Sequence, residues 1–483
     1  MLKPLQEIIQ ETENLTECNK KNKKFIHNKN IKFFFEKIAK SNLFKFTHKF
    51  PEKCNDAKSL YDQCKEKYNN SKMPSSMTLQ HTTKPKNLKH YNKITTTFRT
   101  SFHVSDTHGE FDTSIKAIKN CFDENGCLLK NLVIINHGDM IDRGERSIAN
   151  LIFWLKLKQQ YPNQIVLLRG NHEHKGTYNC YGSSWQNKFK KCDVTPHLDK
   201  IFNQLPIYDL NMIPDKNNEL KVLLSAHGGP QSCKTTKTSF KKICGSEVNP
   251  NSYADNPLWN EATFAYGLGL PIDQDKDLDG KANKSRGGVG VYIGKSTKQQ
   301  LLKHGISKVC VGHSHKDSSK TFLKEYLNII ITTQDKQYKN PVIGMMTTNG
   351  FKIYPIGEIP THSEIKKMIE ETDECIKKSK KKIEKKSEIK SGKKQPHSDK
   401  GKPTTPKPKQ PKKSKYNVWQ YLCKNIFCPL FYSLTGNYFL HAVNLHYNKT
   451  YKKNFNQSTF FYRNRKKSSK NHNHAEKPNQ KYT

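Results

Sequence analysis

Five short apolar runs along the chain each end in a polar side chain. The runs are rich in β-branched residues, a composition typical of buried strands, and they occur in "FHVSDTHGEFD", "LVIINHGDMIDRGERS", "IVLLRGNHEH", "VLLSAHGGP" and "VCVGHSHKDSS". The polar residues that follow them are Asp106 and His108, Asp139, Asn171, His227, and His313 with His315. We expect strands of one sheet to deliver these side chains to one edge.

A helical pattern lies between the second and third runs. Ile148, Leu151, Ile152 and Leu155 recur at helical spacing, which predicts an amphipathic helix from Arg146 to about Tyr161 that returns to the strand in "QIVLLRGN". Strand, loop, helix and strand then repeat, an order that gives right-handed crossovers and places loops at the carboxyl ends of strands. The pattern predicts an α/β fold.

The polar residue types after the runs indicate metal chemistry. Carboxylate, imidazole and amide oxygen are ligands of divalent cations, and a carboxylate such as that of Asp139 can bridge two of them. Two ions roughly 3.5–4 Å apart can share a water, lower its pKa toward about 7 and direct the bridging hydroxide in line at phosphorus. Manganese, iron and zinc are all compatible with this ligand set.

Longer blocks around these residues identify a family. "GDMIDRGERS", "LLRGNHEHKGTYNCYG", "IFNQLPIYDL" before "AHGG", "PLWNEA" and "SRGGVGVYIG" occur in one order within about residues 95–357. This stretch resembles the phosphoprotein phosphatase (PPP) family of serine/threonine phosphatases, within the calcineurin-like metallophosphoesterases. The resemblance implies a hydrolase of phosphomonoesters with phosphoprotein substrates. The implied fold is a metallophosphoesterase β-sandwich of two sheets flanked by helices.

The resemblance also implies roles for single residues. One metal would be bound by Asp106, His108 and Asp139, and the other by Asp139, Asn171, His227 and His313. His172 would pair with Asp142 and donate a proton to the leaving oxygen as general acid. Arg143 and Arg286 would hold the phosphate oxygens, because a planar guanidinium meets two oxygens at once, and Asn171 would also contact the substrate.

Two departures from the family pattern leave the substrate open. Ser105 stands where the family has glycine, and "VGHSH" stands where it has Arg-Ala-His-Gln. His315 is therefore either a further ligand of the first metal or a loop histidine, and Tyr338 is the candidate substrate-side tyrosine. The alternatives to a protein phosphatase are a hydrolase of diadenosine tetraphosphate, a phosphodiesterase, and a non-catalytic scaffold.

The stretch "DKDLDG" has the spacing of the start of an EF-hand loop, with Asp275, Asp277, Asp279 and Gly280. The twelfth position of such a loop should be a bidentate glutamate, and here it is Arg286. We therefore interpret the stretch as an acidic, solvated loop beside the mouth of the active site.

The length and charge of the chain indicate several segments around one catalytic domain. It has 483 residues and a formal net charge of +41, from 84 Lys+Arg against 43 Asp+Glu. We predict a basic, Lys/Asn-rich, partly helical and loosely attached N-terminal extension (1–92) and the catalytic domain (93–362). Next comes a Lys/Pro-rich disordered linker (363–415), which opens with a charged helical stretch. An aromatic-rich segment with a basic tail (416–483) follows it. The extensions are basic and of low complexity.

The extensions suggest partners and a location. The lysine runs are either a solvated tether or a binding site for an anionic partner, nucleic acid or a membrane surface. The aromatic residues 416–447 are either a segment that docks a partner or a membrane surface, or a small appendage packed on the catalytic domain. The beginning of the chain lacks the pattern of a signal peptide, and thirteen scattered cysteines favour a reducing compartment. We expect a protein of the cytoplasm or nucleus that is not secreted.

Overall fold

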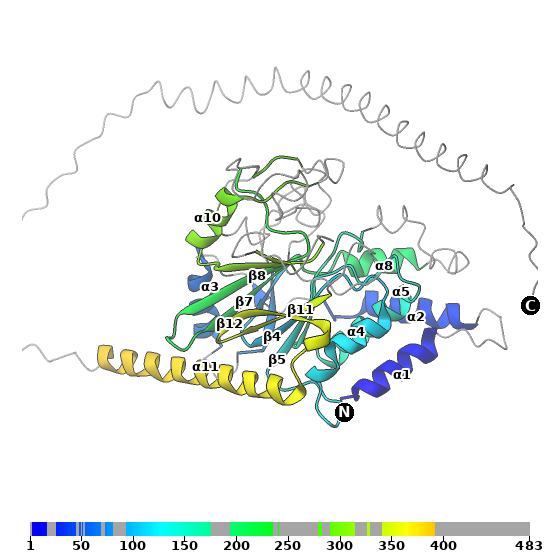
Figure 1. Ribbon diagram of the computed structural model, residues 1–483, viewed down its shortest axis with the longest axis horizontal. Helices are drawn as coiled ribbons and strands as arrows, with labels where there is room; N and C mark the ends of the chain where they lie inside the picture. Colours follow the sequence, from blue (N-terminus) through cyan, green and yellow to red (C-terminus); the bar gives the residue numbers. More distant parts are fainter. Residues whose placement is uncertain are drawn as a thin grey trace, which may run out of the picture. The chain divides into compact units, whose positions relative to one another are not determined.

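Figure 1 shows a computed structural model of the chain. The structure describes residues 2–16, 26–44, 48–49, 51, 54–68, 73–80, 93–174, 194–234, 240, 279–282, 290–313, 326–328 and 341–391. The chain divides into two units, Met1–Gln395 and Pro396–Thr483, and all described residues belong to the first.

Two mixed sheets form the centre of this unit (Figure 1). The seven-stranded sheet has the order β1-β2-β3-β7-β8-β9-β10, with β1 His48–Lys49, β2 Ser76–Gln80, β3 Lys93–Thr97, β7 Tyr208–Pro214, β8 Leu220–Ala226, β9 Lys308–Val311 and β10 Tyr326–Asn328. The five-stranded sheet has the order β12-β11-β4-β5-β6, with β4 Thr100–Val104, β5 Leu132–Asn136, β6 Ile165–Leu167, β11 Val342–Thr347 and β12 Gly350–Pro355. The predicted α/β fold with two sheets is confirmed.

The metal-site motifs fall on both sheets. Strands β4, β5 and β6 pair in parallel in the five-stranded sheet, and β8 and β9 pair in parallel in the seven-stranded sheet. The expectation that strands of one sheet deliver every ligand is therefore wrong. Each sheet contributes adjacent parallel strands, and their carboxyl ends meet at one place.

Helices flank the sheets. The described helices are α1 Leu5–Thr16, α2 Ile26–Lys40, α3 Ala57–Lys67, α4 Phe111–Ile118, α5 Ser147–Gln160, α8 Thr195–Phe202, α10 Lys295–Lys303 and α11 His362–Ser391, with 3₁₀ turns at Lys119–Cys121 and Ile356–Glu358. The charged helix expected at the start of the linker is α11. The rest of the predicted linker lies outside the described residues. No helix of the described part is both long and apolar enough to cross a membrane.

Helix α5 confirms the predicted element but not its amphipathic character. Nearly every side chain in it is buried, including Phe153 and Trp154 as well as the predicted stripe. Its outer face is covered because α1 packs against it. A helix that is apolar on all sides is stable in water only when neighbours cover every face.

The N-terminal extension is partly helical, as predicted, but its described helices are not loosely attached. Helix α1 packs against α5, and α2 packs against α8 and α1 (Figure 1). Leu5, Ile8 and Phe35 are buried in the same hydrophobic core as α5. The domain boundaries themselves stay a prediction.

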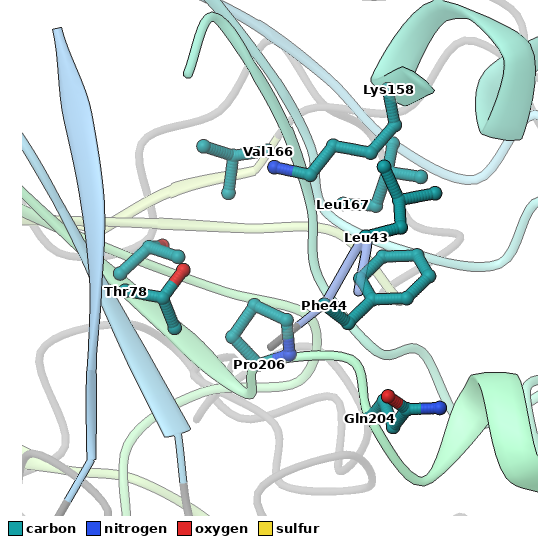
Figure 2. A pocket seen from close by; sticks show the side chains of 9 residues that line it. Leu43, Phe44, Thr78, Lys158, Val166, Leu167, Gln204 and Pro206 are labelled. Carbon is teal, nitrogen blue, oxygen red and sulfur yellow. The ribbon is translucent and has the colours of Figure 1, made fainter. Parts of the chain in front are cut away.

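A pocket beside Lys158 is lined by residues of both sheets, including Thr78 of β2 and Thr95 of β3, and by the segment after α2 (Figure 2). Leu43 and Phe44, which follow α2, line it together with Val166 and Leu167 of the β6 region. The Lys158 ammonium is buried and donates hydrogen bonds to the carbonyls of Pro162 (2.6 Å) and Ile165 (2.7 Å). Burial lowers the pKa of Lys158 to about 8.

Candidate metal centre

The described ligand candidates converge where the two sheets meet. Each follows a strand: Asp106 and His108 follow β4, Asp139 follows β5, Asn171 follows β6, His227 follows β8 and His313 follows β9. All six side chains are buried. The sequence pattern predicted that these side chains, which follow five separate strands, would lie together. It did not predict that the strands belong to two sheets.

Backbone strain is concentrated at this cluster. Four of the six ligand candidates have a left-handed backbone: Asp106 (φ 49°), His108 (φ 42°), Asp139 (φ 55°) and His313 (φ 64°). This conformation costs a non-glycine residue of order 1–3 kcal/mol and is found mostly at functional sites, where the surrounding structure holds it. The strain turns each side chain from the end of its strand back toward the common centre.

Asp139 occupies the centre of the cluster. Its Oδ2 lies 3.3 Å from His227 Nε2, 3.6 Å from His108 Nε2 and 3.8 Å from His172 Nε2. Burial would raise the pKa of the Asp139 carboxyl, but the charges of His227 and His172 lower it well below its ordinary value. A central carboxylate with imidazoles on several sides has the placement required of a bridging ligand.

Asn171 joins the two histidines of the second group. Its Oδ1 lies 2.8 Å from both His227 Nε2 and His313 Nδ1. Together with Asp139, these three side chains form the set that the family resemblance implies for one metal. The other implied set is also assembled, because His108 Nε2 lies 3.8 Å from Asp106 Oδ1 and faces Asp139.

Hydrogen bonds at the outer side of the histidines fix their orientation. His108 Nδ1 donates to the carbonyl of Ile141 (3.0 Å), and His227 Nδ1 donates to that of His137 (3.1 Å). The inner Nε2 atoms are thereby turned to the centre, which is the usual arrangement of metal-binding histidines.

The oxygen atoms around His227 Nε2 favour a positive charge at this position. With its proton on Nδ1, a neutral His227 directs a lone pair at two oxygen acceptors, Asp139 Oδ2 and Asn171 Oδ1. Burial opposes protonation, but the charge and hydrogen bond of Asp139 raise the pKa of His227 to about 9. A proton or a bound cation among these three atoms would satisfy all of them. The donor set therefore fits divalent metal ions.

Ser105 takes part in the site. Its hydroxyl donates to Asp106 Oδ2 at 2.5 Å, and the backbone N–H of His313 donates to the same oxygen at 2.9 Å. These two bonds hold the Asp106 carboxylate. The serine that departs from the family pattern thus adds an interaction that glycine cannot make.

His172 and Asp142 form the pair that the resemblance implies. His172 Nδ1 donates to Asp142 Oδ2 at 2.9 Å, and both side chains are buried. Burial would lower the pKa of His172, but Asp139 and the bond to Asp142 raise it. Arg143 is exposed and close enough to His172 to oppose that rise. Asp142 (φ 71°) and Arg143 (φ 64°) are also left-handed, so one turn directs the carboxylate inward and the guanidinium outward.

Glu173 is a residue to which the sequence analysis gave no role. Its buried carboxylate accepts hydrogen bonds from the backbone N–H groups of Asp139 (2.7 Å), Met140 (2.8 Å) and Gly170 (2.9 Å). Burial, together with the nearby Asp139 charge, raises the pKa of Glu173 to about 7. Glu173 fastens the Asp139 loop to the Asn171 loop. Its place in "RGNHE" was the only signal for it.

The acidic loop was interpreted wrongly at Asp279. This side chain is buried, and it accepts hydrogen bonds from Ser232 Oγ (2.7 Å), Thr297 N (2.5 Å) and Thr297 Oγ1 (2.9 Å). Asp279 thus links the loop after His227 to the first turn of α10. Asp275 and Asp277 lie outside the described residues, as do the site candidates His315, Arg286 and Tyr338.

Comparisons with known proteins find similar sequences. Residues 100–317 match the calcineurin-like phosphoesterase family. The serine/threonine-protein phosphatase 6 catalytic subunit of Caenorhabditis elegans is 31% identical over 212 residues, which cover 43% of this chain and 56% of that protein. The serine/threonine-protein phosphatase T of Trypanosoma brucei brucei is 27% identical over 222 residues, which cover 44% of this chain and 40% of that protein.

A solved structure from Saccharomyces cerevisiae, a protein serine/threonine phosphatase with similarity to human phosphatase PP5, aligns with 72% of this chain and 95% of its own. The TM-score is 0.46 and the identity 15%. The matches to the curated relatives span 33–57% of those proteins' lengths.

The strand ends of the two sheets bring carboxylate, amide and imidazole side chains together, and this group is a candidate metal centre. The family match over residues 100–317 supports a calcineurin-like metallophosphoesterase domain in this part of the chain. Divalent metal ions follow from the family, and the buried groups around Asp139 are the candidates to hold them.

Proposed function

We propose that this protein is a metal-dependent serine/threonine protein phosphatase that hydrolyses phosphomonoesters. The observation that carries the proposal is the cluster around Asp139, beside which the buried His172–Asp142 pair and the exposed Arg143 stand. The curated relatives named as serine/threonine phosphatases support phosphoproteins as the substrate class.

Each residue has a defined part in this proposal. Asp106, His108 and Asp139 would hold one divalent ion, and Asp139, Asn171, His227 and His313 the other. When bound, the ions would supply Lewis acidity and an activated water as the nucleophile. Manganese, iron and zinc all suit the donors, and His315 is the further candidate ligand.

The protein's own groups would handle the phosphate and the leaving group. His172 Nδ1 is held by Asp142, so Nε2 is the atom that would deliver a proton to the seryl or threonyl oxygen. The Asp142 carboxylate stabilises the imidazolium until the proton is transferred. Arg143 would hold the phosphate oxygens, joined by Arg286 and Asn171, with Tyr338 on the substrate side.

The extensions are proposed to direct the catalytic domain. The lysine-rich stretches would bind an anionic partner, either nucleic acid or a membrane surface, and residues 416–447 would dock a partner protein. An intracellular location, in cytoplasm or nucleus, is supported by the buried cysteines Cys64, Cys121 and Cys310, which form no disulfide among the described residues.

The test is hydrolysis by the full chain, because α1 and α2 form part of the core and a fragment starting at residue 93 would lack them. Initial rates are measured with added Mn²⁺ on phosphoserine and phosphothreonine peptides, diadenosine tetraphosphate and a simple phosphodiester. An Asp139→Asn variant is assayed in parallel.

We expect peptide turnover that is lost in the Asp139→Asn variant. A preference for the nucleotide or the diester would replace the proposal with another activity of the same family. No turnover of any substrate by a folded, metal-loaded chain would point to the scaffold.

A further inference from the structure

A second cluster of metal-binding side chains lies in the interior, apart from the one around Asp139. His103 is on β4, His137 directly follows β5 and Cys310 is on β9. None of the three is exposed to solvent. One ligand atom from each lies within 4.8 Å of those of the other two. The family comparison and the proposed reaction assign no role to this cluster.

The two imidazoles face each other. His103 Nδ1 lies 3.0 Å from His137 Nε2. Two nitrogens that bind one tetrahedral zinc ion with Zn–N bonds of about 2.0–2.1 Å are roughly 3.3 Å apart. Two lone pairs at this separation repel each other, so either a proton or a cation must lie between the rings.

The outer nitrogens have partners suited to metal-binding histidines. His137 Nδ1 donates to the carbonyl of Ala226 at 3.0 Å, which leaves Nε2 with its lone pair turned inward. His103 Nε2 is 2.7 Å from the hydroxyl oxygen of Ser101, which can accept a hydrogen bond from a protonated Nε2. In that tautomer the lone pair of His103 is on Nδ1 and points inward. Backbone and hydroxyl partners of this kind fix the tautomer and orientation of a ligand.

The interior position of His103 also favours the form of the ring that binds metal. Burial lowers the pKa of His103 well below its usual range, so the ring is neutral at physiological pH. Neutral imidazole is the form that coordinates cations.

The position of Cys310 favours a cation over a proton between the imidazoles of His103 and His137. A proton shared between the rings needs no third group, whereas the sulfur of Cys310 approaches the same place and makes no hydrogen bond among the described residues. Two imidazoles and a thiolate are a donor set preferred by Zn²⁺. The Ser225 hydroxyl oxygen lies 3.5 Å from His103 Nδ1 and is a further oxygen beside the cluster.

We propose that His103, His137 and Cys310 bind a structural Zn²⁺ ion between the two sheets. On binding, the Cys310 thiol releases its proton and the proton of His103 moves from Nδ1 to Nε2. The ion joins β4 and the end of β5 in one sheet to β9 in the other. It lies beneath the candidate catalytic cluster, because the carbonyl of His137 also accepts the hydrogen bond of the ligand candidate His227.

Cobalt substitution tests this site separately from the catalytic one. Thiolate bound to Co²⁺ gives a charge-transfer absorption in the near ultraviolet, and the candidate catalytic ligands include no sulfur. The full chain is stripped with a chelator, reconstituted with Co²⁺ and compared with Cys310→Ser. Cys121→Ser is the matched control, since Cys121 is equally buried but outside the cluster.

We expect the absorption in the wild type and in Cys121→Ser, and its loss in Cys310→Ser. Native mass spectrometry should find one zinc ion fewer in Cys310→Ser than in the wild type. A folded wild type without the absorption, or an absorption that persists in Cys310→Ser, would overturn the proposal. Where Cys310→Ser does not fold, absence of the absorption in the folded wild type still overturns the proposal, and His103→Ala replaces Cys310→Ser as the variant expected to lose the absorption.

Discussion

The imidazole of His172 is held by Asp142 through a hydrogen bond of 2.9 Å, while its other nitrogen faces Asp139 at 3.8 Å. One carboxylate therefore positions the ring and the other belongs to the metal cluster. The two functions are separated on opposite edges of one imidazole, so that they can be tested by separate substitutions.

The His172→Asn variant tests the proton-donating edge. We expect kcat to fall by about 10²–10⁴-fold, the usual contribution of general acid catalysis, with metal content unchanged. A substrate whose leaving group needs no proton, such as a nitrophenyl phosphate, should lose much less. Equal losses on both substrates would contradict the role, and Asp142→Asn should show the same pattern more weakly.

The Asp139→Asn variant tests the central carboxylate. Because Asp139 faces three imidazoles, loss of its charge should weaken binding of both ions and nearly abolish hydrolysis. Metal content is measured by mass spectrometry beside activity. Metal retention with intact activity would refute the assigned centre. Comparison with His172→Asn separates loss of metal from loss of the proton donor.

Asp279 is expected to contribute to stability through the loop that it fixes. Asp279→Ala removes the acceptor of the Ser232 hydroxyl and of two Thr297 groups, which should cost about 2–4 kcal/mol in the free energy of unfolding. Asp279→Asn keeps an acceptor oxygen and should cost less. Urea denaturation of the two variants measures the difference. Equal stability of Asp279→Ala and wild type would show that the linkage contributes nothing.

Lys158 should make stability depend on alkaline pH. Its pKa is about 8 in the folded protein against 10.5 for an ordinary lysine. Below pH 8 the ammonium is charged in both states, so the full burial cost is present. Between about pH 8 and 10.5 the folded state releases its proton first and stability rises by roughly 3 kcal/mol.

The Lys158→Met variant should lack that rise. The free energy of unfolding is measured at several pH values for the wild type, Lys158→Met and the exposed-lysine control Lys303→Met. The difference between the wild type and Lys158→Met gives the contribution of Lys158 to the rise in stability. Parallel curves for wild type and Lys158→Met would contradict the assignment.

The N-terminal helices supply a matched pair of substitutions. Phe35 is fully buried in the core, whereas Phe33, two positions earlier in α2, is 68% exposed. Phe35→Ala should cost about 3–5 kcal/mol and Phe33→Ala within about 0.5 kcal/mol. Thermal or urea unfolding measures both. A similar small effect of the two would show that α2 is attached as loosely as the sequence suggested.

The strand-and-loop pattern was sufficient to predict which side chains lie close together. Each apolar run is a strand, and a polar residue after a strand can only project from its carboxyl end, so Asp139 and His227 could be grouped without coordinates. Their division between two sheets could not be predicted, because a strand's sequence does not state its neighbours. His315, Arg286 and Tyr338 stay predictions.

The errors have identifiable physical causes. Helix α5 was taken as amphipathic from one stripe, although Phe153 and Trp154 on the other side already required a covering partner. Asp279 was taken as solvated because its neighbours in sequence are charged. Its burial depends on Ser232 and Thr297, which are distant in sequence, and no local pattern shows such contacts.

The packing of α1 against α5 has a consequence for synthesis of the chain. Helix α1 leaves the ribosome well before α5, since α5 follows β4 and β5 in the sequence. The helix against which α1 packs is therefore not yet available when α1 is made. At about 5–20 residues per second, the nascent helix waits on the order of ten seconds with Ile8 and its neighbours uncovered. During that interval the apolar face is a natural binding site for a chaperone, so the yield of folded protein in a cell should depend on what occupies the helix before its partner is made.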